Sequence, residues 1–141
     1  MGKLLQRLSD AAKSGVYRTA RADDVLDAAR GSGLRVTQID FRGVTEKAAL
    51  LERIASALQF PEHFGRNWDA LEDCLSDLSW SKATGHVLLF AGAQALPADE
   101  RGILVDILAS AAAYWAERKR PFFAVFLDTA AALPDLYLEK K

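Results

Sequence analysis

The chain has little of the chemistry that most enzymes and metalloproteins use. Its 141 residues include one cysteine and two histidines. A single cysteine excludes a disulfide within the chain and is typical of a reducing compartment. Two isolated histidines and one cysteine cannot form a zinc cluster, and no phosphate-binding glycine loop is present. We therefore expect neither a metal nor a cofactor.

Long apolar runs and an excess of one charge are also missing. No apolar run approaches the roughly 20 residues of a membrane-spanning helix. Lys3, Arg7 and Asp10 lie among the N-terminal leucines, where a signal peptide would be uncharged. The net charge is −1 and the pI is about 6.1, which argues against nucleic acid binding through phosphate contacts. These features predict a cytoplasmic protein that binds neither membranes nor nucleic acid directly.

The residues that are present suit one globular domain, because 50% of them are hydrophobic. Apolar runs predict strands at 34–40, 86–92 and 122–127, and a short additional strand at 16–19. Helical spacing of apolar residues predicts helices at 3–13, 23–30, 45–58, 67–78 and 97–119. Since strands alternate with helices, we expect an α/β fold. Its small parallel sheet has three core strands and an extra N-terminal edge strand, packed with helices.

The stretch 67–78 predicts a short helix with two unlike faces. One face is apolar and holds Trp68, Leu71, Cys74, Leu75 and Leu78. The opposite face is acidic and polar, and holds Asp69, Glu72, Asp73, Ser76 and Asp77. Asn67 at the start can cap the first turn with its side chain.

Helix stability alone does not explain these acids. Asp69 suits the first turn, but Asp77 lies near the last turn, where the helix dipole disfavours an anion. Asp73 lies four residues from each of them and repels both by roughly a few tenths of a kcal/mol per pair. Two interpretations stay open. The acids form a solvated helix face, as most charge runs do, or a surface that docks on a cationic, phosphate-holding pocket.

Residues 60–75 resemble the signature of the barstar family, intracellular inhibitors of the ribonuclease barnase. The matching residues keep a fixed register without a gap: Pro61-Glu62, Phe64-Gly65, Asn67, Asp69-Ala70-Leu71 and Asp73-Cys74-Leu75. Elsewhere the resemblance is one of element order. It implies a barstar-like domain at 34–128, an N-terminal extension at 1–33 packed on the same domain, and a C-terminal tail at 129–141.

The resemblance implies a protein inhibitor of antitoxin or immunity type rather than an enzyme. Its partner would be a ribonuclease of the barnase type, bound by a monomer without a cofactor. In the family, the acidic helix and the loop before it fill the active site of the enzyme. The motif implies that Asp69 and Asp73 contact the cations of the enzyme, with Asp73 as the central anion. Asn67 and Gly65 would shape the surface, and His63 replaces a family tyrosine that packs on the enzyme.

The chain departs from the family at the rim of this surface. Glu72 stands where the prototype has a tryptophan, which exchanges an aromatic contact for a charge. Ser76 and Asp77 replace a threonine-glycine pair. The long helix of the family also contributes a glutamate. Glu117 lies near that place, although an ungapped count gives Ala116.

Two other functions stay open. A barstar-fold interaction module could use the same acidic surface to bind a different basic protein or toxin. A small enzyme could use His63 with a carboxylate as acid and base, although no substrate pocket is identified. Cys74, on the apolar helix face, and His86, at the start of a strand, are expected to be structural.

Overall fold

A computed structural model describes residues 2–60, 67–78, 83–127, 133 and 136. Its strands form one parallel sheet in the order β1-β4-β3-β2: β1 (Gly15–Thr19), β2 (Leu34–Asp40), β3 (Gly85–Ala91) and β4 (Phe122–Leu127). The helices are α1 (Gly2–Leu8), α2 (Ala22–Ala29), α3 (Lys47–Leu58), α4 (Trp68–Leu75) and α5 (Ala98–Glu117), with 3-10 turns η1 (Ala11–Lys13) and η2 (Ala93–Ala95). The predicted α/β fold is confirmed, including the N-terminal edge strand.

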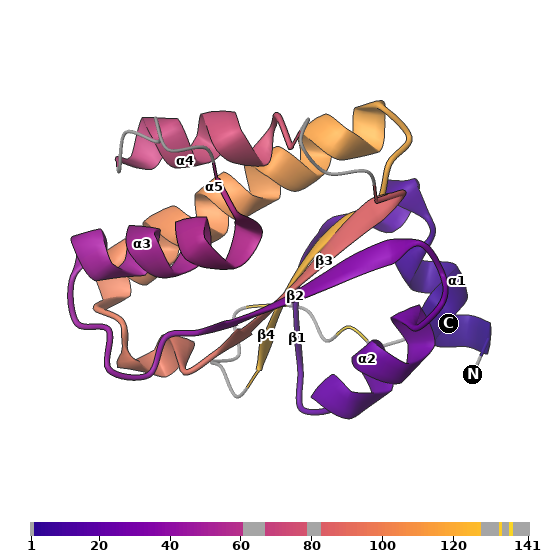
Figure 1. The fold of residues 1–141 in the computed structure, drawn as a ribbon, viewed down its shortest axis with the longest axis horizontal. Helices are drawn as coiled ribbons and strands as arrows, with labels where there is room; N and C mark the ends of the chain where they lie inside the picture. The colour runs from indigo at the N-terminus through magenta and orange to yellow at the C-terminus, as the bar shows by residue number, and fades with distance from the viewer. Residues whose placement is uncertain (1, 61–66, 79–82, 128–132, 134–135, 137–141) are drawn as a thin grey trace.

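The two faces of the sheet carry different helices. Helices α3, α4 and α5 cover one face, and α1 and α2 cover the other (Figure 1). Side chains alternate between the faces along a strand. In β3, Leu88 and Phe90 pack toward α3–α5, whereas Val87 and Leu89 pack toward α1 and α2. Both faces are therefore buried, which explains the near-continuous apolar sequences of β3 and β4.

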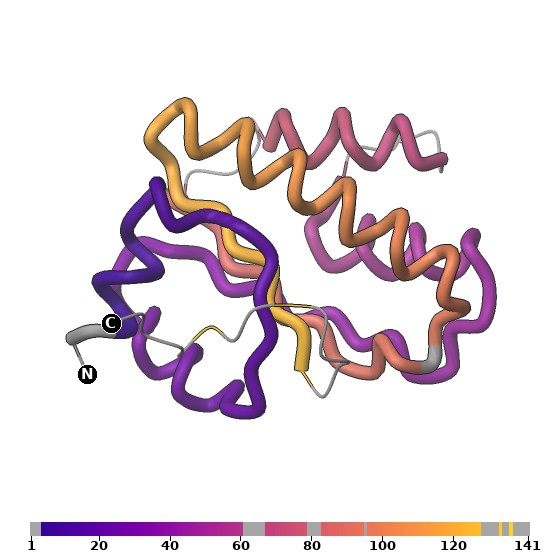
Figure 2. The backbone as a smooth tube through the Cα atoms, turned by 180° about the vertical axis from the view of Figure 1, so that it is seen from behind, coloured from indigo at the N-terminus to yellow at the C-terminus, as the bar shows by residue number. Residues whose placement is uncertain are grey.

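The N-terminal segment builds the second of two apolar cores. Seen from behind, it lies across the sheet on the side away from α3–α5 (Figure 2). Leu8 of α1 and Val25 of α2 are fully buried there. The buried residues of this core are Leu8, Val25, Val87, Leu89, Phe123, Val125 and Leu136. The sheet thus shares its second core with residues that precede β2.

Strand β1 lies beside β4, at the opposite edge of the sheet from β2. The chain therefore crosses the whole sheet between β1 and β2, and α2 passes over the face opposite α3–α5. The connections from β2 to β3 and from β3 to β4 run back in the other direction over the face that α3–α5 cover. A connection that runs in the opposite direction over the opposite face has the same handedness. All of these connections therefore share one crossover hand, as the strong preference for right-handed parallel connections requires.

The acidic helix is shorter than predicted. It was expected to reach Leu78, but α4 ends at Leu75 with Ser76 as its C-cap. The backbone N–H groups of Asp77 and Leu78 both donate to the Cys74 carbonyl, at 3.1 and 3.2 Å. Leu78 adopts a left-handed conformation (φ 45°), which turns the chain out of the helix.

The other helix boundaries also differ from the predictions, those of α2 and α5 by only one or two residues. The helix expected at 3–13 is divided into α1 and η1, because Asp10 Oδ1 accepts a hydrogen bond from the Ala12 N–H and starts a new turn. The helix predicted from residue 45 begins two residues later. Helix α3 begins at Lys47 after Glu46, and its N-cap makes no side-chain hydrogen bond.

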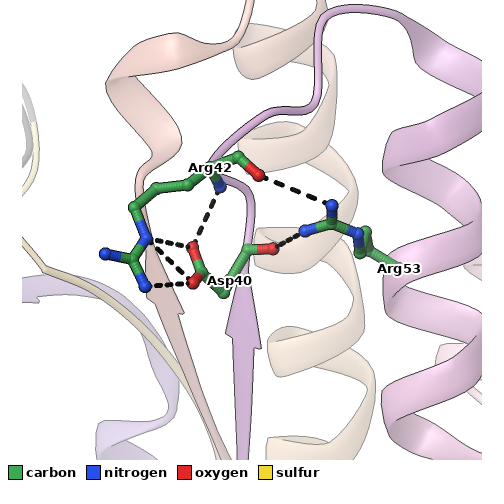
Figure 3. A network of polar contacts seen from close by, with 3 residues as sticks. All are labelled: Asp40, Arg42 and Arg53. Atoms are coloured by element: carbon green, nitrogen blue, oxygen red, sulfur yellow. Dashed lines mark hydrogen bonds and ion pairs between the residues drawn. The ribbon is translucent and has the colours of Figure 1, made fainter.

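A polar network joins the end of β2 to α3 (Figure 3). Arg42 Nη2 lies 2.6 Å from Asp40 Oδ2, and the Arg42 N–H donates to Asp40 Oδ1 at 2.9 Å. These hydrogen bonds from Arg42 hold the pKa of Asp40 at about 2. The Arg53 guanidinium donates to the backbone carbonyls of Asp40 and Arg42. The network fixes the loop that leads from the sheet into α3.

Replacement by alanine should change the free energy of unfolding in opposite directions at two glycines. Gly92 has φ 74°, and a Cβ there would lie 2.8 Å from Arg42 Cγ and 2.9 Å from Arg42 N. We expect Gly92→Ala to lower the free energy of unfolding by about 2–3 kcal/mol. Gly102 lies inside α5 with nothing within 4 Å of a Cβ, so Gly102→Ala should raise it by about 0.5–1 kcal/mol. Urea unfolding measures both, and changes of the same sign would contradict the prediction.

Candidate functional site

One face of helix α4 is anchored in the first apolar core, which lies between the sheet and helices α3–α5. Leu71 and Leu75 are fully buried, and Leu78, just beyond the helix, is 4% exposed. Trp68 packs against this core but is only half-buried, as is Cys74. The predicted apolar face is therefore correct, although its two outer members reach solvent.

The start of α4 is fixed by its cap. Asn67 Oδ1 accepts a hydrogen bond from the backbone N–H of Ala70 at 2.7 Å, as predicted. This bond satisfies one of the four N–H groups that have no partner within the helix. Asn67 itself is exposed. Its side chain therefore sets the helix direction while it stays at the surface.

The opposite face of α4 presents carboxylates to solvent. Asp69, Glu72 and Asp73 are exposed, as is Asp77 just after the helix, and Ser76 is half-buried. In the described part of the chain, ion pairs join Arg21–Asp24, Arg30–Asp27, Arg42–Asp40 and Arg118–Glu117. None of these pairs includes an acid of α4 or Asp77. We call Asp69, Glu72, Asp73 and Asp77 the acidic face.

The far end of α4 is tied to α5. Trp115 Nε1 donates a hydrogen bond to the Leu75 carbonyl at 2.8 Å. The last carbonyls of a helix have no partner within it, so an indole N–H from α5 satisfies one of them. Forty residues separate the two partners, so no local pattern could reveal their contact.

Three further residues were predicted to bind the partner. His63 and Gly65 fall outside the described residues. Glu117 is exposed at the end of α5, with Arg118 Nη1 3.9 Å from its carboxylate. At about 100° per residue, Glu117 lies about 200° around the helix from Trp115, which contacts α4. By this helical angle, Glu117 and the residue that contacts α4 lie on different sides of α5, and the role of Glu117 stays a prediction.

Cys74 has the surroundings of an unreactive thiol. Burial, followed by the negative charges of Asp77 and Asp73, raises its pKa above the ordinary value. A nucleophilic cysteine needs the opposite, namely cations that favour the thiolate. Within the described residues, no group of three or more histidine, cysteine or carboxylate side chains could hold a metal ion. Likewise, no helix of the described segments has the length and apolar character to span a membrane.

His86 is buried at the start of β3, with 8% of its surface exposed. Desolvation, and then the positive charges of Arg35 and Arg120, lower its pKa to about 4. The folded protein therefore holds a neutral imidazole where the unfolded chain, with a pKa near 6.5, takes up a proton.

This pKa shift predicts a loss of stability in acid. The free energy of unfolding should fall as the pH drops below 6.5, by about 2–3 kcal/mol near pH 4, because only the unfolded chain gains the His86 proton. Urea unfolding between pH 7 and 4 measures the slope. His86→Gln should flatten it, and an equal slope in that variant would contradict the assignment to His86.

Leu71 tests the anchoring of the acidic face. We expect Leu71→Ala to lower the free energy of unfolding by about 2–5 kcal/mol, because it leaves a cavity at a fully buried position. Glu72→Ala, the next residue on the exposed face, should change it by less than about 0.5 kcal/mol. Thermal or urea unfolding compares the two. Similar losses in both variants would show that the anchor is not Leu71.

Comparison with known proteins gives a family match. Residues 34–127 match the family model described as Barstar (barnase inhibitor), which is two-thirds of the chain. The matched region includes α4, α5 and the strands β2 to β4. No curated protein matches the chain.

Proposed function

The chain belongs to the barstar family, and on this premise we propose that it inhibits a ribonuclease of the barnase type. The acidic face of α4, with the loop before it, would fill the active site of the enzyme. The observation that carries the proposal is the set of four exposed carboxylates without an ion pair among the described residues.

The pairing of charges separates these carboxylates from others on the surface. Asp24, Asp27 and Asp40 each have an arginine within 3.3 Å. Since the acidic face has no such partner among the described residues, its negative potential is available to a cationic partner. An active site that binds RNA presents cations for the phosphates, and exposed carboxylates can replace those phosphates.

The mounting of α4 suits a surface that binds without rearrangement. Its apolar side is fixed by Leu71 and Leu75, its start by the Asn67 cap and its end by Trp115. A partner that binds a fixed surface does not lose free energy to order it, so more of the interaction appears as affinity. The acidic face is therefore fixed at both ends of α4 before a partner binds.

We assign roles in the proposed complex by position. Asp73 is the central anion, with Asp69 and Glu72 beside it. Asn67 and Ser76 contribute polar contacts at the two ends of α4. His63 and Gly65 of the preceding loop, and Glu117 of α5, would add contacts at the rim. A monomeric inhibitor of this kind would act in the cytoplasm as an antitoxin or immunity protein.

Inhibition of RNA cleavage tests this function. A purified guanyl-specific microbial ribonuclease is assayed with increasing amounts of the protein, at roughly 20 and 200 mM salt. We expect activity to disappear near an equimolar ratio, and association to slow at the higher salt, because the attraction between unlike charges is screened. Full activity in the presence of excess folded protein would contradict inhibition of this class of enzyme.

A second partner is favoured by Glu72. It is exposed at the rim, where the prototype has a tryptophan. Replacing an aromatic contact with a charge suits a more basic target, such as another toxin. Salt-sensitive binding of a basic protein without any effect on ribonuclease activity would support this candidate instead.

A further inference from the structure

Helix α5 ends in a turn that holds a lysine in a strained conformation. The Lys119 N–H donates to the Ala116 carbonyl and the Arg120 N–H to the Trp115 carbonyl, each at 3.0 Å. This pair of hydrogen bonds forms the Schellman motif, in which Lys119 takes the left-handed conformation, with φ 62°. Glycine is the usual residue at this position, because a side chain disfavours left-handed backbone. Lys119 therefore lowers the stability of a helix end that glycine would suit better.

No contact of the Lys119 side chain offsets this strain. The side chain is exposed and, within the described residues, takes part in no ion pair, hydrogen bond or cation–π contact. Arg118 and Arg120 already place cations at this end of α5, where the helix dipole favours them. The helix end therefore does not require a third cation in place of glycine. Strain that the fold does not explain points to a role in function.

The two neighbours of Lys119 are occupied by contacts within the protein. The Arg118 guanidinium lies over the Tyr114 ring, 3.6 Å from its centre, and the Arg120 guanidinium lies 5.8 Å from the centre of the Trp115 ring. We call Arg118, Lys119 and Arg120 the basic segment. Because its two arginines rest on aromatic rings, Lys119 supplies the cation that is most available to a partner.

The basic segment borders the C-terminal end of α4. Trp115, about one helical turn before Lys119, donates its indole N–H to the Leu75 carbonyl at 2.8 Å. Trp115 and Arg120 also line a small cavity together with Leu78, the residue that follows the acidic face. A partner that covers the acidic face therefore meets the basic segment at this end of α4.

We propose that Lys119 determines the specificity of the inhibitor, because its ammonium group contacts a carboxylate that the target carries beside its cationic active site. This inference rests on the proposed ribonuclease inhibition and adds a charge of the opposite sign to the binding surface. A target with cations opposite the acidic face and a carboxylate beyond the end of α4 matches both charges. A uniformly basic target is repelled by Lys119, so the same residue discriminates against it.

Three substitutions separate the charge of Lys119 from its backbone. Lys119→Gly removes the side chain and the strain, so it should raise the unfolding temperature by about 1–4 °C. It should also weaken binding of a guanyl-specific microbial ribonuclease about three- to fivefold, as expected for an exposed ion pair. Lys119→Gln should weaken binding equally but change the unfolding temperature by less than about 1 °C, and Lys119→Arg should bind normally. A lysine with a purely structural role would not lower the affinity while its replacement raises the stability.

A matched control removes a positive charge elsewhere. Arg30 is exposed at the end of α2, which covers the other face of the sheet, and Arg30→Gln should change the affinity by less than about 1.5-fold. Surface plasmon resonance on the immobilised ribonuclease, at roughly 20 mM salt, measures all affinities. If the wild type binds and inhibits but Lys119→Gly and Lys119→Gln bind equally well, or lose no more affinity than Arg30→Gln, the role of Lys119 is overturned and the inhibition stands. If the folded wild type does not inhibit, the proposed function fails and this inference fails with it.

Discussion

Asp73→Ala should weaken binding of a barnase-type ribonuclease by roughly a thousandfold or more. Asp73 is exposed at the middle of α4 and has an acid of the same face on either side. The substitution would leave cations of the enzyme buried without their counter-charge, which is the most costly kind of interface change. The largest effects of this kind were measured on barnase with barstar, so the magnitude is taken from that pair. Surface plasmon resonance or inhibition titration measures the affinity.

The matched control removes the same charge from another helix. Asp23 is exposed in the first turn of α2, which covers the other face of the sheet. Asp23→Ala should change the affinity by less than about threefold, through a weaker long-range field alone. Asp73→Asn keeps the size of the side chain and should lose nearly as much affinity as Asp73→Ala. Equal effects of the Asp23 and Asp73 variants would show that the partner senses net charge rather than the acidic face.

Removal of residues 1–33 should abolish cooperative folding. The deletion takes away β1, α1 and α2, and so uncovers Val87, Leu89, Phe123 and Val125, each at most 1% exposed in the folded protein. Full burial of such a side chain contributes about 1.5–3 kcal/mol, so these four account for about 6–12 kcal/mol. The net stability of a domain is about 5–15 kcal/mol. Circular dichroism and urea unfolding of residues 34–141 test this expectation.

Point variants keep the test informative if the shortened chain is insoluble. Leu8 is fully buried against the second face of the sheet, whereas Gln6, on the same helix, is exposed. Leu8→Ala should lower the free energy of unfolding by about 2–5 kcal/mol, and Gln6→Ala should change it by less than about 0.5 kcal/mol. A stable, cooperative unit formed by residues 34–141 would show instead that the extension is dispensable for the fold.

The sequence predicts the elements of this fold better than their arrangement. The strands at 34–40 and 122–127 have the predicted bounds, because their apolar patterns are continuous and end at turns. The position of β1 next to β4 is a matter of tertiary packing that periodicity does not contain. The end of α4 is also set by local hydrogen bonding at Cys74, which no side-chain pattern reveals.

In the candidate site too, the features set by local sequence were predictable and those set by tertiary packing were not. The two faces of α4 and the Asn67 cap were predictable, because a helix repeats every 3.6 residues and a cap uses one side chain. The contact of Trp115 with Leu75 was not, since it depends on how two helices pack. The role of Glu117 stays a prediction, because a place near the family glutamate does not decide which face of α5 its side chain joins.

The strand order has a consequence for synthesis of the protein. Strands β1 and β2 leave the ribosome first, yet they form the two edges of the sheet and do not pair with each other. The centre is filled afterwards by β3 and then β4, so β1 has no neighbour until residues 122–127 have emerged. The sheet therefore closes only when residues 122–127 have been translated, and it remains incomplete in shorter nascent chains. If the protein neutralises a toxin made in the same cell, this interval sets the minimum lead that its own synthesis requires.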